Sequence, residues 1–263
     1  RVYKLAWDDG TPLTVIGTDG GLLERAVQRN YVMLAPGERI ESWVDFSGRE
    51  SGAMMQLRSL QFSGAEMGMG GNQMLPNGAP FNVMNVRVVG RTGEPTPPPT
   101  QLSTISRYRM EDAVNRNAPR SFAVSMGGGM MGGGMRWLLN GRSYQEAEVA
   151  TNEIVRLNTT EVWELINNST GGMMGMSMVH PIHIHGLQFQ VIERQIASQM
   201  TAGYETVRYG YVDEGWKDTV MMMPGERIRL LLRFEDFTGK YVYHCHNLEH
   251  EDAGMMRNYL VRA

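Results

Sequence analysis

The 263-residue sequence contains a single cysteine, Cys245, so no disulfide can form within the chain and cysteine usage does not identify a redox compartment. It also lacks an excess of either charge, because 25 basic and 28 acidic residues leave a net charge of -3. No apolar run approaches the ~20 residues that span a bilayer. We therefore expect neither nucleic acid nor a membrane among the partners of this chain.

Long helical patterns are scarce as well, because glycine and proline interrupt almost every apolar run. Short runs with a period of two residues alternate instead with turn signals, which predicts an all-β fold built from β-sandwich domains. In the first part we expect strands at residues 1–5, 13–17, 31–34, 40–46 and 81–89. In the last part we expect them at residues 121–126, 136–139, 154–157, 162–167, 182–192, 218–223, 228–234, 241–245 and 256–261.

A proline-rich segment divides the chain. Residues 93–100 read Gly-Glu-Pro-Thr-Pro-Pro-Pro-Thr, a composition typical of an extended linker, and residues 107–115 are compatible with one short helix. We predict a first domain at residues 1–92, a linker at residues 93–118 and a last domain at residues 119–263. Because the first residues already read as a strand, we expect the first domain to be truncated at its N-terminal end.

All six histidines fall in two short segments, residues 180–185 and 244–250, and the second segment also holds Cys245. Residues two apart on a strand project from the same face. His183 therefore shares a face with His185, and His244 shares one with His246, while Cys245 points to the opposite side of its strand. This alternation predicts two metal centres on either side of one strand.

On the thiolate side, Cys245, His250 and Met255 lie within one strand and the loop that follows, and His180 could join them from the other segment. A thiolate, two imidazoles and a weak axial methionine are the ligands of an electron-transfer copper. Zinc also binds cysteine and histidine, but a structural zinc site usually recruits two or more cysteines. One cysteine among six histidines favours copper.

The spacing His-Pro-x-His-x-His-Gly, followed by His-Cys-His-x3-His-x4-Met, resembles the two C-terminal copper-binding motifs of multicopper oxidases. It is most similar to the branch of bacterial laccases, spore-coat laccases and cuprous oxidases. Residues 14–23, 34–39 and 215–220 extend the resemblance over nearly the whole chain. The resemblance implies two cupredoxin-like Greek-key β-sandwich domains, which correspond to the middle and last domains of such an enzyme.

The resemblance also implies the metal ligands and the reaction. A laccase-like enzyme of this family oxidises its reductant by one electron at type 1 copper and reduces O2 to water by four electrons at a trinuclear cluster of type 2 and type 3 copper. Family habit suggests a periplasmic or extracellular location. Carried over by position, the ligands are His180, Cys245, His250 and Met255 for type 1, His183 for type 2, and His185, His244 and His246 for type 3.

Half of the expected cluster ligands are missing from this chain. The family cluster takes four of its eight histidines from an N-terminal domain, and no histidine precedes His180 here. We therefore expect the missing N-terminal cupredoxin domain of the same protein as a partner. The alternative is a stand-alone blue-copper electron-transfer or copper-binding protein, which would have no need for His183, His185, His244 and His246.

Two acidic residues near the histidines have possible roles. Glu251 matches a family position implicated in delivering protons to the cluster, as a carboxylate is chemically suited to do; the alternative is a solvated acidic loop. Asp218 could orient a ligand histidine, or could simply end a strand.

The 22 methionines divide into two kinds. Met33, Met84 and residues 221–223 lie in strand-like runs, which predicts that they belong to the core. Others, including Met176 and Met178, lie in glycine-rich segments, and thioethers there could bind Cu(I). We accordingly expect the reductant to be a phenolic or aromatic compound or Cu(I). The alternative role for these segments is flexibility or protection from oxidation.

Overall fold

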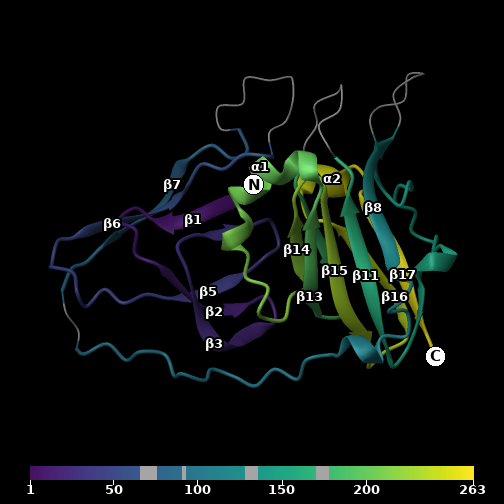
Figure 1. The fold of residues 1–263 in the computed structure, drawn as a ribbon, viewed down its shortest axis with the longest axis horizontal. Coiled ribbons are helices and arrows are strands. Elements are labelled where there is room, and N and C mark those ends of the chain that lie inside the picture. Colours follow the sequence, from purple (N-terminus) through teal and green to yellow (C-terminus); the bar gives the residue numbers. More distant parts are fainter. Residues whose placement is uncertain (66–75, 91–92, 128–135, 170–177) are drawn as a thin grey trace.

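The computed structural model describes residues 1–65, 76–90, 93–127, 136–169 and 178–263. Within them the chain forms four β-sheets and two α-helices of five residues each, which confirms the predicted all-β class. Strands β1 to β7 lie on one side of the molecule and strands β8 to β17 on the other (Figure 1). None of the helices in the described part of the chain has the length and apolar character needed to cross a membrane.

The first region, β1 to β7, contains two sheets with the strand orders β4-β1-β6-β7 and β3-β2-β5. Its core draws on both sheets, for example through the buried side chains of Leu5, Val15 and Met55. The sequence did not predict β3 or β6, because charged and amide side chains break their apolar alternation. The bounds are β1 (Tyr3–Trp7), β2 (Leu13–Thr18), β3 (Gly21–Arg29), β4 (Val32–Leu34), β5 (Ile40–Trp43), β6 (Met54–Ser59) and β7 (Phe81–Arg87).

The second region, β8 to β17, contains two five-stranded sheets with the orders β10-β17-β16-β12-β14 and β13-β15-β11-β8-β9. Aromatic side chains from both sheets, including Phe122, Trp163 and Tyr243, pack in the core that they share. The bounds are β8 (Arg120–Gly127), β9 (Arg136–Leu139), β10 (Ile154–Arg156), β11 (Thr159–Asn167), β12 (His180–Ile184), β13 (Phe189–Ile196), β14 (Thr219–Met222), β15 (Glu226–Phe234), β16 (Gly239–Cys245) and β17 (Met256–Arg262).

One predicted strand, residues 182–192, is in fact two strands in different sheets, β12 and β13. The chain turns at Gly186, whose φ of +81° is disfavoured for other residues. A Cβ there would also lie 2.5 Å from the Tyr241 ring. This turn ends the first histidine segment and sends the chain to the other sheet.

The two regions are connected by residues 93–118 and by direct packing. The connection runs along the outside of the molecule (Figure 1). In place of the predicted helix at residues 107–115 it contains only the 3-10 helix η1 (Met110–Asp112). Val2 and Met33 of the first region share a buried apolar cluster with Val207 and Met221 of the second. The two regions therefore form an extensive apolar contact, while the exact bounds 1–92 and 119–263 stay a prediction.

The predicted core methionines are confirmed with one exception. Met33 and residues 221–223 are at most 4% exposed. Met84 is 47% exposed, so its assignment to the core is wrong. It lies on β7, which is the edge strand of its sheet and leaves most of its side chains accessible.

Candidate metal centres

Strands β12 and β16 bring the two histidine segments together. They are antiparallel neighbours, with Ile182 opposite Cys245 and His183 opposite His244. The helix α2 (Leu248–Asp252) follows β16 directly and carries His250. This pairing places the ligand candidates of both segments within one short stretch of sheet.

The first group lies on the core side of β16. The Cys245 Sγ is 3.6 Å from the His180 Nδ1 and 3.5 Å from the His250 Nδ1, and all three residues are buried. Met255 is completely buried beside them: its backbone N–H donates to the His250 carbonyl, and its own carbonyl accepts from the Cys245 N–H. The chain thus gathers a thiol, two imidazoles and a neighbouring methionine, the residues that the sequence analysis named as candidates.

The second group lies on the opposite side of β16. One ring nitrogen from each of His183, His185 and His244 falls within 4.8 Å of the others, and the Nε2 atoms of His185 and His244 are 3.1 Å apart. The His246 ring centroid is 5.4 Å from that of His244 and 5.8 Å from that of His183. His183 and His185 are less buried than His244.

Comparison with known proteins identifies the family. A family model for multicopper oxidases matches residues 124–263. The laccase of Bacillus subtilis is 31% identical over 98% of this chain and 48% of its own length, and the bilirubin oxidase of Albifimbria verrucaria is 31% identical over 95% and 40%. A variant of the multicopper oxidase McoA from Aquifex aeolicus superposes with a TM-score of 0.76 at 29% identity, over 100% of this chain and 53% of that structure.

The chain belongs to the multicopper oxidase family. The structural similarity confirms the predicted cupredoxin-like β-sandwich architecture. The chain spans about half the length of the curated relatives it matches. Membership of this family implies copper as the cofactor, and the two groups of side chains are the candidates to hold it.

The donors of the first group in this multicopper oxidase chain have the chemistry of a copper site. Burial lowers the pKa of His180 to about 3 and that of His250 to about 4, so both imidazoles stay neutral and can bind a metal. Burial raises the pKa of the Cys245 thiol to about 12. At neutral pH the buried thiol therefore stays protonated unless a cation stabilises the thiolate. A bound metal does so, since it deprotonates a coordinating thiol outright. The residues present therefore fit copper.

An aromatic side chain and a cavity border the first group. The Trp137 ring packs against that of His250, with centroids 4.0 Å apart and planes inclined by 30°. A cavity of about 480 Å³ opens beside them and is lined by Trp137, Met178, Glu249 and His250, among others. Met178 is 9% exposed. The other methionine singled out in the sequence, Met176, lies outside the described residues.

The predicted proton carrier Glu251 lies on α2 beside the second group. Its Oε2 is 3.5 Å from the His244 Nδ1. Burial and the neighbouring imidazole of His183 lower the pKa of His185, and burial likewise lowers that of His244. The position of Glu251 brings a carboxylate to the histidine side of β16.

Asp218, the residue just before β14, contacts the second group. Its Oδ1 is 3.4 Å from the His183 Nδ1, and its backbone carbonyl is 3.0 Å from the same nitrogen. Burial would raise the pKa of Asp218, but hydrogen bonds involving Arg39, His183 and Thr219 outweigh burial and hold that pKa well below its usual range. Of the two roles considered for Asp218, its contacts favour the orientation of a histidine.

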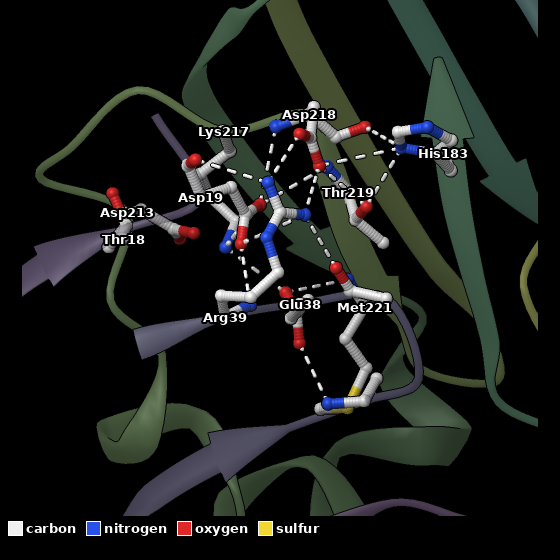
Figure 2. A network of polar contacts seen from close by, with 12 residues as sticks. Thr18, Asp19, Glu38, Arg39, His183, Asp213, Lys217, Asp218, Thr219 and Met221 are labelled. Carbon is white, nitrogen blue, oxygen red and sulfur yellow. Dashed lines mark hydrogen bonds and ion pairs between the residues drawn. The ribbon is translucent and has the colours of Figure 1, made fainter. Parts of the chain in front are cut away.

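A polar network joins the first region to the second group (Figure 2). Lys217 is 4% exposed, and its Nζ lies 3.2 Å from the Glu38 Oε1 and 3.6 Å from the Asp19 Oδ2. Sequence reasoning did not single out these residues or Trp137. Only the family resemblance of residues 14–23, 34–39 and 215–220 pointed to the stretches from which the network is built.

Proposed function

We propose that this chain is part of a copper-dependent, laccase-like oxidase that couples one-electron oxidation of a reductant to four-electron reduction of O2 to water. One observation carries the proposal: Cys245, His180 and His250 gather on one side of β16, and His183, His185 and His244 gather on the other. The two groups are separated by a single peptide strand, so electron transfer between them would follow a short covalent path.

In this proposal His180, Cys245 and His250 bind type 1 copper with Met255 as the axial ligand. His183 binds type 2 copper, and His185, His244 and His246 bind type 3 copper. When bound, copper would supply one-electron transfer at the first group and O2 chemistry at the second. The ligands missing from the second group would come from an N-terminal cupredoxin domain of the same protein, a partner consistent with relatives about twice as long as this chain.

The side chains around the first group prepare it for electron transfer. The neutral imidazoles of His180 and His250 offer lone pairs, and the Cys245 thiol releases its proton on binding the metal. Trp137 packs on His250 and the core buries the group, which limits the rearrangement that accompanies a change of charge.

The cavity beside His250 is the proposed site of the reductant. Trp137 offers an aromatic wall for a phenolic or aromatic compound, and Met178 offers a thioether to Cu(I), with Met176 two residues earlier in the sequence. Replacement of Met178 by leucine keeps the apolar volume but removes the sulfur. If Met178 binds Cu(I) as the substrate, the variant should oxidise Cu(I) more slowly than the parent and oxidise phenols at the parent rate. A variant that oxidises both reductants at the parent rate would show that Met178 has no such role.

Glu251 is the proposed proton carrier on the histidine side, because four protons must reach each O2 and its carboxylate lies beside His244. In the complete enzyme, Glu251→Gln should retain its copper and turn over more slowly. Unchanged turnover at full copper content would refute the role. By family resemblance we also propose a periplasmic or extracellular location.

Reconstitution with Cu(II) tests the central claim. The chain should develop the intense visible absorption of copper bound to a thiolate, and without the N-terminal domain it should not reduce O2 at the rate of a complete enzyme. A colourless copper-loaded chain would exclude the type 1 assignment. Full O2 reduction by this chain alone would contradict the half-cluster. The stand-alone electron-transfer alternative predicts the same colour but no Cu(II) binding at the second group.

A further inference from the structure

The turn at residues 35–39, between β4 and β5, brings the first region against the second group. Gly37 in this turn has a φ of +84°, and a Cβ on it would lie 2.5 Å from the His246 Cδ2. The glycine therefore lets the backbone pass directly against an imidazole of the second group. Arg39, two residues later, points toward the same group (Figure 2).

Arg39 grips Asp218 with both terminal nitrogens. Its Nη1 donates to the Asp218 Oδ1 at 2.7 Å and its Nη2 donates to the Asp218 Oδ2 at 2.6 Å. The Arg39 side chain is 52% exposed, but a bidentate arginine–carboxylate pair fixes direction as well as distance. The guanidinium is itself held, because it donates to the backbone carbonyls of Gly37 and Asp19.

Asp19 supports the same arrangement from the turn after β2. Its Oδ1 accepts from the Arg39 backbone N–H at 2.7 Å, and its Oδ2 accepts from the backbone N–H groups of Asp218 and Thr219, both at 3.2 Å. One buried carboxylate thus fixes the backbone on both sides of the contact between the regions.

The chain of contacts ends on one nitrogen of His183. The Nδ1 faces the Asp218 carbonyl at 3.0 Å, the Thr219 Oγ1 at 3.0 Å and the Asp218 Oδ1 at 3.4 Å. The Thr219 hydroxyl in turn donates to the Asp218 Oδ1 at 2.8 Å, so its oxygen keeps a lone pair toward the ring. Three acceptors around one nitrogen favour the tautomer with the proton on Nδ1, which leaves the Nε2 lone pair for a metal.

We propose that Arg39 is a positioning residue that acts through Asp218 to fix the ring orientation and the Nδ1–H tautomer of His183. The inference rests on the proposed function of His183 as a copper ligand. It assigns to the first region, which contributes no ligand of its own, control over metal affinity in the second. Since Arg39 and Asp218 lie 179 residues apart in the sequence, this affinity depends on the docking of the two regions.

The test uses the Cys245→Ser form of the chain, in which the thiolate group no longer competes for the metal. Arg39→Met removes both hydrogen bonds to the Asp218 carboxylate. Arg39→Lys keeps the charge without the bidentate geometry, and Arg107→Met is the matched control. Arg107 also joins the regions, since it donates to the Glu24 carboxylate at 2.9 Å and to the Glu214 carbonyl at 2.7 Å, and neither of these partners belongs to the second group.

Two readouts are measured: the tautomer of His183 by nitrogen NMR of the metal-free chain, and the dissociation constant for Cu(II) by competition with a chelator. We expect a single Nδ1–H tautomer in the parent and a mixed population in Arg39→Met, with Cu(II) binding weakened about tenfold. Arg39→Lys should be intermediate, and Arg107→Met should match the parent.

A parent-like tautomer in Arg39→Met, with a dissociation constant within twofold of that of Arg107→Met, would overturn the proposal. Equal loss of Cu(II) affinity in Arg39→Met and Arg107→Met would also overturn it, because the effect would then be general loosening of the regions. If the parent binds no Cu(II) at this group, the proposed function fails there, and the tautomer in the metal-free chain still decides whether Arg39 positions His183.

Discussion

The two groups of histidines differ in what holds them. The first group is buried, and the side chains that pack on its ligands, such as Trp137, come mainly from residues 119–263, while Arg1, Ala65 and Asn77 of the first region line the cavity beside His250. The second group is less buried, and its support comes partly from Asp19, Gly37 and Arg39 of the first region. The first group is therefore held mainly by its own region, and the second depends in part on the neighbouring region.

This difference follows from the proposed tasks of the two groups. An electron-transfer site benefits from a rigid, dry environment, which a domain core provides. A site that receives O2 and protons needs access and ligands from more than one domain, so it belongs at a contact between domains. The predictions below test whether the two groups can be perturbed separately.

Cys245→Ser should produce the largest difference between the groups. It removes the only thiol, so the visible absorption of the Cu(II)-loaded chain should disappear completely. Cu(II) binding by His183, His185 and His244 should persist, and electron paramagnetic resonance of the loaded variant would detect it. Loss of copper from both groups in a folded variant would show that they are not separable.

Lys217→Met should act mainly on the contact between the regions that supports the second group. It leaves the Glu38 carboxylate without its cation and Asp19 with Arg39 alone, 3.8 Å away, which should cost about 3–5 kcal/mol of unfolding free energy. Lys240→Met is the control: Lys240 lies at the surface and its loss should cost less than about 0.5 kcal/mol. Urea denaturation measures both. A difference below about 1 kcal/mol would mean that the contact between the regions relies little on Lys217.

Glu153→Gln should act mainly on the side of β16 that holds the first group. Glu153 and Arg257 are both fully buried, and the Glu153 Oε1 also accepts from the Tyr243 hydroxyl at 2.8 Å. Breaking this pair should cost about 3 kcal/mol at neutral pH and weaken the support beneath β16. Cu(II) binding by the second group should change less than the visible absorption of the first.

The cost of Glu153→Gln should also depend on pH. Burial would raise the pKa of Glu153, but Arg257, the Ala150 N–H and Tyr243 together lower it. A lowered pKa means that the carboxylate contributes stability above its unfolded pKa of about 4.3, and that this contribution is lost as pH falls through the folded value. The difference in stability between wild type and variant, measured by denaturation at several pH values, should therefore begin to narrow as the pH falls below about 4.3 and should close only below the lowered folded pKa. A constant gap would contradict the assignment.

Gly37→Ala should disturb the second group alone. Alanine at a positive φ costs about 1–2 kcal/mol by itself, and the new methyl group would press on His246. Gly10→Ala is a matched control, because Gly10 has a φ of +79° and nothing within 4 Å of the added Cβ. Thermal melts should show the smaller loss for Gly10→Ala, and NMR should show a displaced His246 ring only in Gly37→Ala. Equal losses of thermal stability in the two variants would show that the contact between Gly37 and His246 does not affect stability.

Trp137→Leu should have the smallest effect and should be confined to the first group. It replaces the ring packed against His250, and a lost aromatic contact costs about 1 kcal/mol. The visible spectrum should shift while Cu(II) affinity at the second group stays the same. Trp43→Leu in the first region is the control, and a spectral shift of equal size there would show that Trp137 has no particular role.

The sequence predicted the strands that alternate clearly and the ligand candidates that lie on them. The faces of β12 and β16 followed from a period of two residues, which is why Cys245 and His244 could be placed on opposite sides in advance. Local patterns did not predict β3 and β6, where charged side chains hide the alternation, or the break at Gly186, where apolar and polar residues alternate on both sides of the glycine.

Most of the residues that support the two groups could not be predicted from the sequence, for a different reason. Asp218 lay close enough to a motif to be considered, but Arg39 and Trp137 have no local signature. Each meets a histidine or its partner only after strands distant in sequence have packed. Pairwise contacts of this kind depend on the docking of sheets and regions, and a single sequence carries no direct signal of them.

The strand β16 also limits how this protein can change in evolution. The two groups use side chains that project from opposite faces of the same strand. A single insertion or deletion at residues 244–246 would therefore exchange these faces and damage both centres at once. An insertion at residues 247–249 would displace His250 of the buried centre and also Glu251, the carboxylate beside the second group. We therefore expect length variation among related sequences to be excluded from the first position and limited at the second.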